Sequence, residues 1–295
     1  MSKANVVAIL SPGDMGSGVG RALAEHGFDV ITALDGRSQR SRQLADAANI
    51  RDVGDLDEVV IQADLILSIL PPASAMAQAE AVATAMQNTG QKPDYADCNA
   101  ISPATSAAVG LSIRAVGANY IDGGIIGLAP GKGPATRFYV SGPNLSSIEV
   151  LDGAGIQVKS VGAEIGRASG LKMCYAGLTK GQFTLFTAVL LAAEAMGLSE
   201  PFREELEFSQ AQVYGRMQGV VPRLPADAGR WIGEMEEIAQ TFADAGVTPD
   251  FHNAAADIFR LLDKTPFAAE TRETLDSSRT LEQSVRVYRN YLDKT

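Results

Sequence analysis

The pattern of apolar and polar residues divides the chain into two parts. In the first part, short apolar runs alternate with longer segments of helical periodicity. The opening unit is a strand at residues 5–10, a helix that ends near Glu25 before Gly27, and a second strand at 28–34. Further strands are predicted at residues 65–70, 94–97, 119–121 and 138–140. Regular alternation of this kind is typical of a mainly parallel sheet with helices on both faces.

The second part begins with one long apolar stretch, residues 166–197, which contains no proline and ends at Gly197. A single helix of about 30 residues would span roughly 45 Å, so we expect it to join two bodies. Its C-terminal half has few polar positions, and we expect that half to be buried on all sides. Four more helices are predicted, at residues 200–219, 223–245, 250–262 and 281–293.

These elements predict an α/β domain at residues 1–163 followed by an all-α domain at residues 164–295, which includes the long interdomain helix. The length of 295 residues fits one large or two ordinary domains. The net charge of −10 argues against nucleic acid and against an anionic membrane surface as partners. The first apolar run is too short for a signal peptide or a membrane span, so we expect a cytoplasmic protein.

Few residues are available for metal or hydrolase chemistry. The chain has two cysteines, Cys98 and Cys174, and two histidines, His26 and His252, none in a metal-binding spacing. No G-x-S-x-G segment is present, so a serine hydrolase is not expected. We predict no metal site, and we expect His252, at a helix start, to be structural.

The segment S-P-G-D-M-G follows the first strand directly and opens the first helix. This is the setting in which a Rossmann-type domain binds a dinucleotide. A glycine at position 13 lets the backbone approach the pyrophosphate, and one at position 16 lets the helix pack on the strand. The predicted cofactor contacts here are Ser11, Gly13, Asp14, Met15 and Gly16. The alternative is an ordinary strand-to-helix turn in a flavodoxin-like fold.

The end of the second strand carries two opposed signals for the adenosine ribose. Asp35 would accept hydrogen bonds from the ribose and favours NAD, although Asp-Gly is also ordinary turn chemistry. Arg37, Ser38 and Arg40 would hold a 2′-phosphate and favour NADP. Because three groups suit a phosphate and one suits a hydroxyl, we predict NADP as the preferred cofactor and keep NAD as the alternative.

Ligands of such folds lie beyond the carboxyl ends of the strands. In this chain those ends carry Leu70 and Pro71, Asn99, and the glycines Gly123 and Gly124. We therefore add Leu70, Pro71 and Asn99 to the predicted cofactor contacts.

These segments resemble those of the β-hydroxyacid dehydrogenases, which include 3-hydroxyisobutyrate and 6-phosphogluconate dehydrogenases. Within that family the chain is most similar to a bacterial branch with a C-terminal domain of unknown function, and the resemblance covers essentially the whole chain. The family's motifs G-x-G-x-M-G, L-P, D-x-S-T-I-x-P, D-A-P-V-S-G-G and G-x-G-x-x-x-K fall at residues 11–16, 70–71, 97–103, 122–128 and 166–172. The resemblance implies that Lys172 is the catalytic lysine.

Several positions differ from the family pattern. Asn99-Ala100 stands where the family has Ser-Thr, and Ile126 replaces the serine of S-G-G. Ala176, with Tyr175 beside it, stands where an asparagine follows the lysine by four residues. The cofactor and lysine positions thus match the family, while the positions that hold the substrate acid largely do not.

The resemblance implies an NAD(P)-dependent oxidoreductase that transfers hydride between nicotinamide and a small, anionic hydroxy acid or its oxo form. Lys172 would exchange a proton with the substrate oxygen, which requires a pKa lowered by burial and by the oxidised nicotinamide. Asn99 would orient the substrate oxygen or the nicotinamide amide. Gly123 and Gly124 would offer backbone N–H groups to a substrate carboxylate.

In the helical part, Arg230 stands beside Trp231, the sole tryptophan. In one interpretation Arg230 meets the anionic substrate and Trp231 walls the pocket. In the other, they form a surface ion pair and a core packing contact. The apolar helices also predict a homodimer formed through this part of the chain.

Two rival functions stay open. One is an imine reductase, an architecture in which the lysine is commonly replaced by an acid or tyrosine, with Tyr175 as the candidate. The other is a non-catalytic NADP-binding regulatory protein, which the changes at Asn99, Ala100 and Ile126 would favour.

Overall fold

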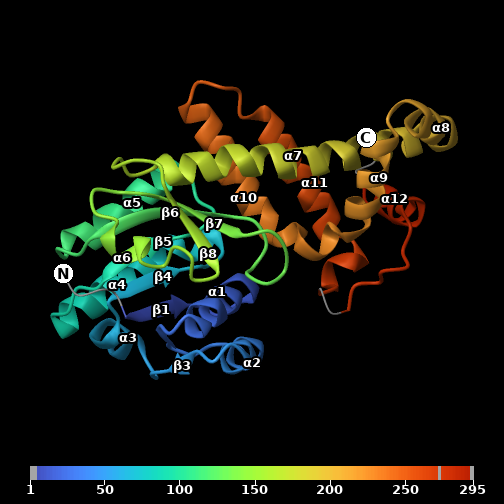
Figure 1. Ribbon diagram of the computed structural model, residues 1–295. Coiled ribbons are helices and arrows are strands. Elements are labelled where there is room, and N and C mark those ends of the chain that lie inside the picture. The colour runs from blue at the N-terminus through green and yellow to red at the C-terminus, as the bar shows by residue number, and fades with distance from the viewer. Residues whose placement is uncertain (1–4, 272–273, 293–295) are drawn as a thin grey trace. The chain divides into compact units, whose positions relative to one another are not determined.

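The computed structural model describes residues 5–271 and 274–292 and divides into two compact units, Met1–Met173 and Cys174–Thr295 (Figure 1). We call them the sheet unit and the helical unit. The boundary falls inside helix α7 (Arg167–Ala195), which is continuous across it. The first seven residues of α7, about two turns, therefore belong with the sheet unit. The domain boundary predicted at residue 163 lies shortly before this helix.

The sheet unit is built on an eight-stranded sheet. Its strands are β1 (Val6–Leu10), β2 (Asp29–Thr32), β3 (Arg51–Asp52), β4 (Leu65–Ser68), β5 (Asp94–Asp97), β6 (Tyr120–Ile126), β7 (Thr136–Ser141) and β8 (Ile156–Ser160). The order across the sheet is β3-β2-β1-β4-β5-β6-β7-β8, and the pairs are parallel except for the antiparallel pair β6–β7. This confirms the α/β fold class predicted from the alternating pattern.

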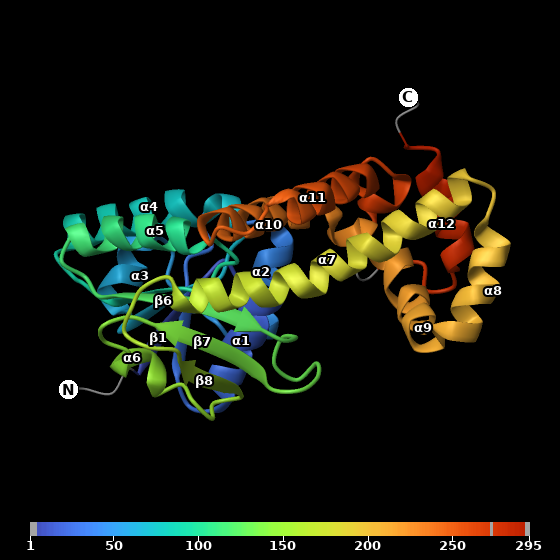
Figure 2. The ribbon, with the colours of Figure 1, turned by 90° about the horizontal axis from the view of Figure 1, so that it is seen from above.

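Helices cover both faces of this sheet because successive strand residues point to opposite sides. Val7 and Ile9 pack in one core with α1 (Asp14–Glu25), α2 (Gln39–Ala47) and α6 (Ser146–Glu149). Ala8 and Leu10 pack in the other core with α3 (Leu56–Gln62), α4 (Ala75–Thr89) and α5 (Pro103–Ala115). A short turn of 3₁₀ helix, η1 (Pro72–Ser74), leads into α4. Figure 2 shows α4 and α5 side by side on their face of the sheet.

Some elements of the sheet unit carry no strong sequence signal. The two-residue strand β3 is exposed, α2 buries one residue of nine, and β8 is largely exposed. The strand predicted at 119–121 continues to Ile126, so Gly123 and Gly124 lie inside β6 and not after it. The prediction was wrong there because two adjacent glycines normally end a strand, whereas here β7 pairs with them.

The helical unit consists of the rest of α7 and the elements that follow it. These are α8 (Ser199–Ser209), α9 (Ala211–Val220), η2 (Val221–Arg223), α10 (Pro225–Asp244), α11 (Asp250–Asp263), η3 (Pro266–Ala269) and α12 (Leu281–Arg289). The single helix predicted at 200–219 is broken at Gln210, where neither glycine nor proline gives a signal. The last helix was predicted to reach Asp293, but α12 ends at Arg289 and residues 290–292 are not helical, so the predicted helix is too long; Asp293 itself lies outside the described residues.

Helices α10 and α11 form an antiparallel pair joined by a five-residue connection, 245–249. Gly229 near the start of α10 faces Asp263 at the end of α11. A Cβ on Gly229 would lie 2.7 Å from Asp263 Oδ1. His252 is buried, packs edge-on against Phe242 with ring centroids 4.3 Å apart, and lies over Gly177 of α7. Its place in this packing agrees with the structural role expected for it.

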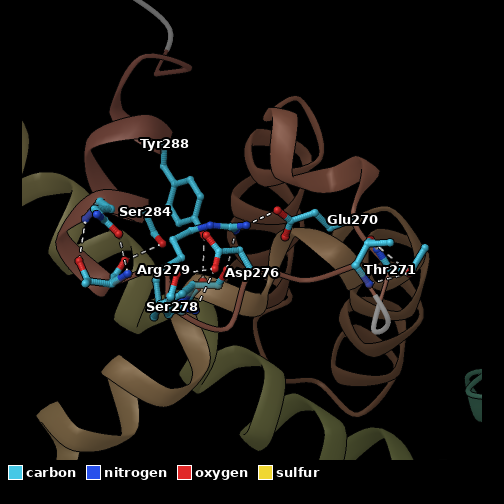
Figure 3. A network of polar contacts seen from close by, with 12 residues as sticks. Glu270, Thr271, Asp276, Ser278, Arg279, Ser284 and Tyr288 are labelled. Carbon is cyan, nitrogen blue, oxygen red and sulfur yellow. Dashed lines mark hydrogen bonds and ion pairs between the residues drawn. The ribbon is translucent and has the colours of Figure 1, made fainter.

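The segment between α11 and α12 is held by Arg279, which is almost fully buried (Figure 3). Its guanidinium is directed at the carboxylate of Glu270, donates to the Pro222 carbonyl at 3.3 Å and lies 3.6 Å from the ring centroid of Phe267. Tyr288 of α12 donates to the Val221 carbonyl at 3.0 Å. The Arg279 guanidinium thus provides hydrogen-bond donors to the Glu270 carboxylate and to the Pro222 carbonyl.

Helix α7 is not buried on all sides in its second half. In that half Leu185 is 60% exposed, and in the first half Leu178 is 69% exposed and Tyr175 45% exposed on the same side of the helix. The prediction of all-round burial was wrong because residue counting shows how apolar a helix is, but not which face finds a neighbour.

By length and composition alone, α7 would also suffice to cross a membrane. Its polar side chains are nevertheless partnered by protein groups, Lys172 by the Ile125 carbonyl and Lys180 by Glu234. Core helices of soluble proteins meet the same criterion. The cytoplasmic location remains a prediction.

Candidate functional site

Most predicted site residues follow a row of paired residues that crosses four neighbouring strands, β1, β4, β5 and β6. Leu10 of β1 pairs with Ser68 of β4, Ser68 with Asp97 of β5, and Asp97 with Asp122 of β6. Ser11, Leu70, Asn99 and Gly123 follow within two residues of these row positions. The register therefore brings the predicted segments to the same edge of the sheet, where ligands of open α/β sheets bind.

The glycine segment has the geometry expected of a phosphate-binding turn. Ser11 has a left-handed backbone with φ of 64°, which explains why a glycine suits the first position of such a motif. Gly13 is the N-cap of α1, and a Cβ there would meet no atom within 4 Å. A Cβ at Gly16 would lie 2.9 Å from the Ser11 carbonyl oxygen, so Gly16 is required for the helix to pack on the turn. The α1 N-terminus fits an anionic diphosphate.

The adenosine-side residues lie in the turn after β2 and at the start of α2. Asp35 is exposed. Ser38 caps α2, its Oγ accepting from the Ser41 amide at 3.2 Å, and Arg37 donates to Gln78 Oε1 at 3.3 Å. Arg40 forms an ion pair with Asp14, N to O 2.9 Å, which joins this segment to the first residue of α1. The two predicted cofactor segments are therefore in contact.

Two neighbours of this segment, Arg42 and Gln78, were not predicted from the sequence. Arg42 donates to the Leu34 carbonyl and so holds the turn that carries Asp35. Gln78 lies on α4 and becomes a neighbour of Arg37 only through the fold. A basic residue close to the strand end was the available signal for Arg42.

Asn99 ties the ends of β4 and β5 together. It is 2% exposed, its Oδ1 accepts from the Leu70 amide at 2.5 Å, and its Nδ2 donates to Ser68 Oγ at 3.1 Å. The backbone amide of Asn99 donates to Asp97 Oδ1 at 2.9 Å. The side chain thus fixes the Leu70-Pro71 segment, while a direct contact of Asn99 with cofactor or substrate remains a prediction.

Asp97 is buried in the middle of this row. Its Oδ2 has no hydrogen-bond partner among the described residues. Burial raises the pKa of Asp97 to about 7, opposed by the Asn99 hydrogen bonds and assisted by the nearby Asp122 carboxylate. The sheet edge therefore holds a carboxyl group that changes charge near neutral pH.

Lys172 lies on α7 over strand β6. Its Nζ donates to the Ile125 carbonyl at 2.6 Å, and the side chain is half-buried. A Cβ on Gly124 would lie 2.8 Å from the Lys172 Cβ and 2.9 Å from the Ala168 carbonyl oxygen. A Cβ on Gly123 would lie 2.8 Å from the Asp97 carbonyl oxygen and 3.0 Å from Cys98 Sγ. The two glycines thus let α7 and the end of β5 pack closely against β6. Binding of a substrate carboxylate by their backbone N–H groups remains a prediction.

The remaining predicted substrate residues, Tyr175, Arg230 and Trp231, lie in the helical unit. Tyr175 is exposed. Arg230 pairs with Asp227 at 2.7 Å and Glu234 at 3.4 Å, and Trp231 packs edge-on against Phe259 with centroids 5.4 Å apart. These contacts are those of the ion-pair and packing interpretation. Contact of Arg230 with a substrate remains a prediction.

The sequence did not reveal the buried ion pair between Lys180 of α7 and Glu234 of α10. Burial lowers the pKa of Lys180, and the Glu234 carboxylate opposes that shift. The ammonium lies 5.4 Å from the Trp231 ring centroid. A lysine within an apolar helix and a glutamate on another were the only signals. Within residues 5–271 and 274–292, no group of three or more His, Cys, Asp or Glu side chains could hold a metal.

Known families and structures match both units. Residues 7–151 match the NAD binding domain of 6-phosphogluconate dehydrogenase, and residues 193–262 match a domain of unknown function, DUF1932. A conserved protein of unknown function, described as structurally similar to 3-hydroxyacid dehydrogenases, is 25% identical, with a TM-score of 0.65 over 87% of this chain and 96% of its own.

Two functionally described proteins share the fold. The 3-hydroxyisobutyrate dehydrogenase of Mycobacterium tuberculosis, solved with L-serine, is 19% identical, with a TM-score of 0.66 over 97% of this chain and 99% of its own. A reductive aminase from Aspergillus terreus, solved with NADPH, is 16% identical, with a TM-score of 0.53 over 94% of this chain and 98% of its own.

These matches agree with the predicted class, a Rossmann-type dehydrogenase with a helical C-terminal domain. The two family matches and the solved structures together support the β-hydroxyacid dehydrogenase-like family with a C-terminal helical domain. The family match supports a nicotinamide cofactor and an NAD(P)-dependent oxidoreductase.

Proposed function

We propose that the protein transfers hydride between NADP and a small anionic hydroxy acid or its oxo form, with Lys172 as the general acid and base. The observation that carries this proposal is the position of Lys172. It is held over β6 by the Ile125 carbonyl, in the same unit as the glycine turn. When bound, the nicotinamide ring would accept or supply the hydride. The chain's own residues would bind the cofactor, orient the substrate and move the proton.

The glycine turn and Lys172 have separate tasks in this scheme. The N-terminus of α1 and the turn at Ser11 and Gly13 would hold the diphosphate. During reduction the Lys172 ammonium would hydrogen-bond the substrate oxygen and give it a proton, and during oxidation the neutral Lys172 amine would take that proton. The Ile125 carbonyl orients the ammonium before substrate arrives.

The decisive experiment measures NADP- and NAD-linked turnover on a panel of hydroxy acids, sugar acids and their oxo counterparts, for the wild type and Lys172→Ala. General acid–base catalysis contributes about 10²–10⁴-fold, so we expect kcat to fall by that factor while NADPH affinity stays the same. Lys172→Arg is the matched variant, because it keeps the charge but does not release a proton near neutrality. Turnover that survives in Lys172→Ala would remove this lysine from the chemistry.

An imine reductase is the second candidate, and two observations favour it. The reductase fold neighbour solved with NADPH is a reductive aminase, and the Ser-Thr pair of the family is Asn99-Ala100 here. In this case Tyr175 would take the place of the lysine. Cyclic imines and ketone–amine pairs added to the same panel distinguish the two, since a Tyr175→Phe variant would then lose activity and Lys172→Ala would keep it.

The exposed stripe of α7 supports a homodimer. Tyr175, Leu178 and Leu185 are large, apolar and exposed on one side of the helix, a pattern that marks interaction surfaces. We expect the protein to sediment as a dimer and Leu178→Asp to shift it toward monomer. A wild type that sediments as a monomer at every concentration would refute this part of the proposal.

A further inference from the structure

Asp122, the third residue of β6, is a fully buried side chain of the sheet unit. Six hydrogen bonds reach it. Its Oδ1 accepts from Ser106 Oγ at 2.8 Å and from Ser169 Oγ. Its Oδ2 accepts from Ser141 Oγ at 2.8 Å and from the amides of Gly166, Ala168 and Ser169 at 2.9, 3.0 and 3.1 Å.

Three of these donors are backbone amides at the start of α7. The first amides of a helix have no partner within the helix, and the helix dipole favours a negative charge beside them. Asp122 satisfies them from a strand 44 residues or more away in sequence. It fixes the starting point of α7 on β6 in the way an N-cap residue does locally.

Strand β6 holds the next turn of the same helix through Lys172. Ile125, three residues after Asp122, accepts the hydrogen bond from Lys172 Nζ at 2.6 Å. Between them Gly124 lets the helix backbone approach, because a Cβ there would lie 2.8 Å from the Lys172 Cβ. The helix start, the lysine side chain and the strand backbone thus form one continuous contact.

We propose that Asp122 is a positioning residue for Lys172: it sets the place of the first turn of α7 and thereby the direction of the lysine ammonium. This rests on the proposed function only for its effect on catalysis. The placement of Lys172 is a property of the folded chain and is measurable without substrate.

A carboxylate suits this position better than an amide. Both oxygens of Asp122 accept, and every one of the six partners donates. In Asp122→Asn one oxygen becomes an NH₂ group that would face donors. If the NH₂ group takes the place of Oδ2, it faces three backbone amides that cannot accept a hydrogen bond; if it takes the place of Oδ1, the two serine hydroxyls can turn to accept, but the negative charge that the helix start favours is lost. The substitution therefore disturbs the helix start while keeping the side-chain size.

The test compares Asp122→Asn and Ser169→Ala with the control Asp94→Asn. Asp94 is also a strand carboxylate with two side-chain donors, Asn119 and Ser147, but it begins β5, at the opposite end of that strand from Asp97. Two quantities are measured by mass spectrometry. One is hydrogen exchange of the segment 164–172. The other is the rate at which an amine-acylating reagent modifies Lys172, followed across pH to give its apparent pKa.

We expect faster exchange in 164–172, and Lys172 modification accelerated about fivefold, the effect of a local destabilisation of roughly 1 kcal/mol. The apparent pKa of Lys172 should shift in both variants and stay unchanged in Asp94→Asn. Gly124→Ala, which pushes directly on Lys172, should alter its modification profile too. If Asp122→Asn does not fold, Ser169→Ala decides by the same criteria. An unchanged Lys172 profile in a variant whose helix start exchanges faster would overturn the proposal.

Turnover measurements separate this inference from the proposed function. If both hold, Ser169→Ala lowers kcat about tenfold without changing the affinity for NADPH, since small misplacements of a reacting group are costly. If Lys172 is not the acid–base group, Lys172→Ala stays active while the modification profile still depends on Asp122. If the profile is independent of Asp122, the positioning role fails whatever Lys172 does.

Discussion

Asp122 in the sheet unit and Lys180 in the helical unit are both buried ionisable side chains, but their neighbours are of different kinds. Asp122 is surrounded by neutral donors, three of them backbone amides of a helix start. Lys180 is paired with an opposite charge, Glu234, beneath the Trp231 ring. The first arrangement fixes a backbone position, whereas the second neutralises a charge inside packed helices.

The contrast predicts where each substitution acts. Changes near the sheet edge should alter cofactor binding, pH dependence or the placement of Lys172. Changes at the Lys180–Glu234 pair should alter the stability of the helical unit and leave NADPH affinity unchanged. Each experiment below tests one side of that division.

The largest effect on stability is expected from Glu234→Ala. The glutamate side chain is 5% exposed, and its removal leaves the Lys180 ammonium buried without its counter-ion. Such a loss costs about 3–5 kcal/mol in unfolding free energy. Denaturant titration measures it, and NADPH titration should show no change in affinity.

The double substitution Lys180→Met with Glu234→Leu is the control. Replacing both partners by apolar groups is often neutral or stabilising, so most of the lost stability should return. Asp257→Ala, which removes an exposed partner of Arg260, should have little effect. A double variant as unstable as Glu234→Ala would show that the pair contributes through packing and not through charge.

The second effect concerns Asp97 and pH. Its pKa is raised from 3.8 to about 7 in the folded chain, so the folded state binds more protons between these values than the unfolded state. The contribution of Asp97 to stability is therefore fully present below about pH 4 and is lost as pH rises through about 7. A shift of this size corresponds to a few kcal/mol.

Asp97→Asn isolates this contribution, because other groups titrate alike in both proteins. The wild type should lose stability relative to Asp97→Asn between pH 5 and pH 8, and the variant should have the higher melting temperature at pH 8. Thermal unfolding at several pH values measures both. A difference that is constant with pH would mean that Asp97 is ionised throughout this range.

How far the sequence predicts this molecule depends on the range of the interactions involved. The turn at 11–16 and the strand–helix alternation are local, and the structure confirms the α/β class and the sheet edge where the segments meet. The continuation of β6 through Gly123 and Gly124 is not local. It depends on pairing with β7 and on a helix that begins at residue 167.

The same argument explains what was missed in the candidate site. Asp122 was noted as part of a motif, but its six donors come from three separate segments, and no local pattern connects them. Arg230 and Trp231 are adjacent in sequence, which favoured a shared role. The structure places the Arg230 guanidinium 5.7 Å from the Trp231 ring centroid, and the ring also contacts Lys180, the partner of Glu234, so the two residues share one cluster of the helical unit that the sequence does not reveal.

A smaller effect is expected at the adenosine end. If Arg37 binds a 2′-phosphate, Arg37→Ala should weaken NADPH binding about tenfold, or roughly 1.4 kcal/mol, and leave NADH binding unchanged. Fluorescence titration with both cofactors measures the two affinities, with Arg51→Ala as the control for an exposed arginine elsewhere in the unit. Equal weakening for both cofactors would contradict a phosphate-specific role and favour NAD through Asp35.

The smallest effect is expected at Ser11, whose φ of 64° places a residue with a side chain in the left-handed region. That conformation costs a non-glycine residue roughly 1–2 kcal/mol, whereas glycine adopts it without a steric penalty but loses more entropy on folding. Ser11→Gly should therefore stabilise the protein by no more than about 1 kcal/mol. Ser11→Ala, which keeps a Cβ, should not. If the glycine variant also binds NADPH as the wild type does, the Ser11 side chain contributes nothing to cofactor binding, and the turn acts through its backbone alone.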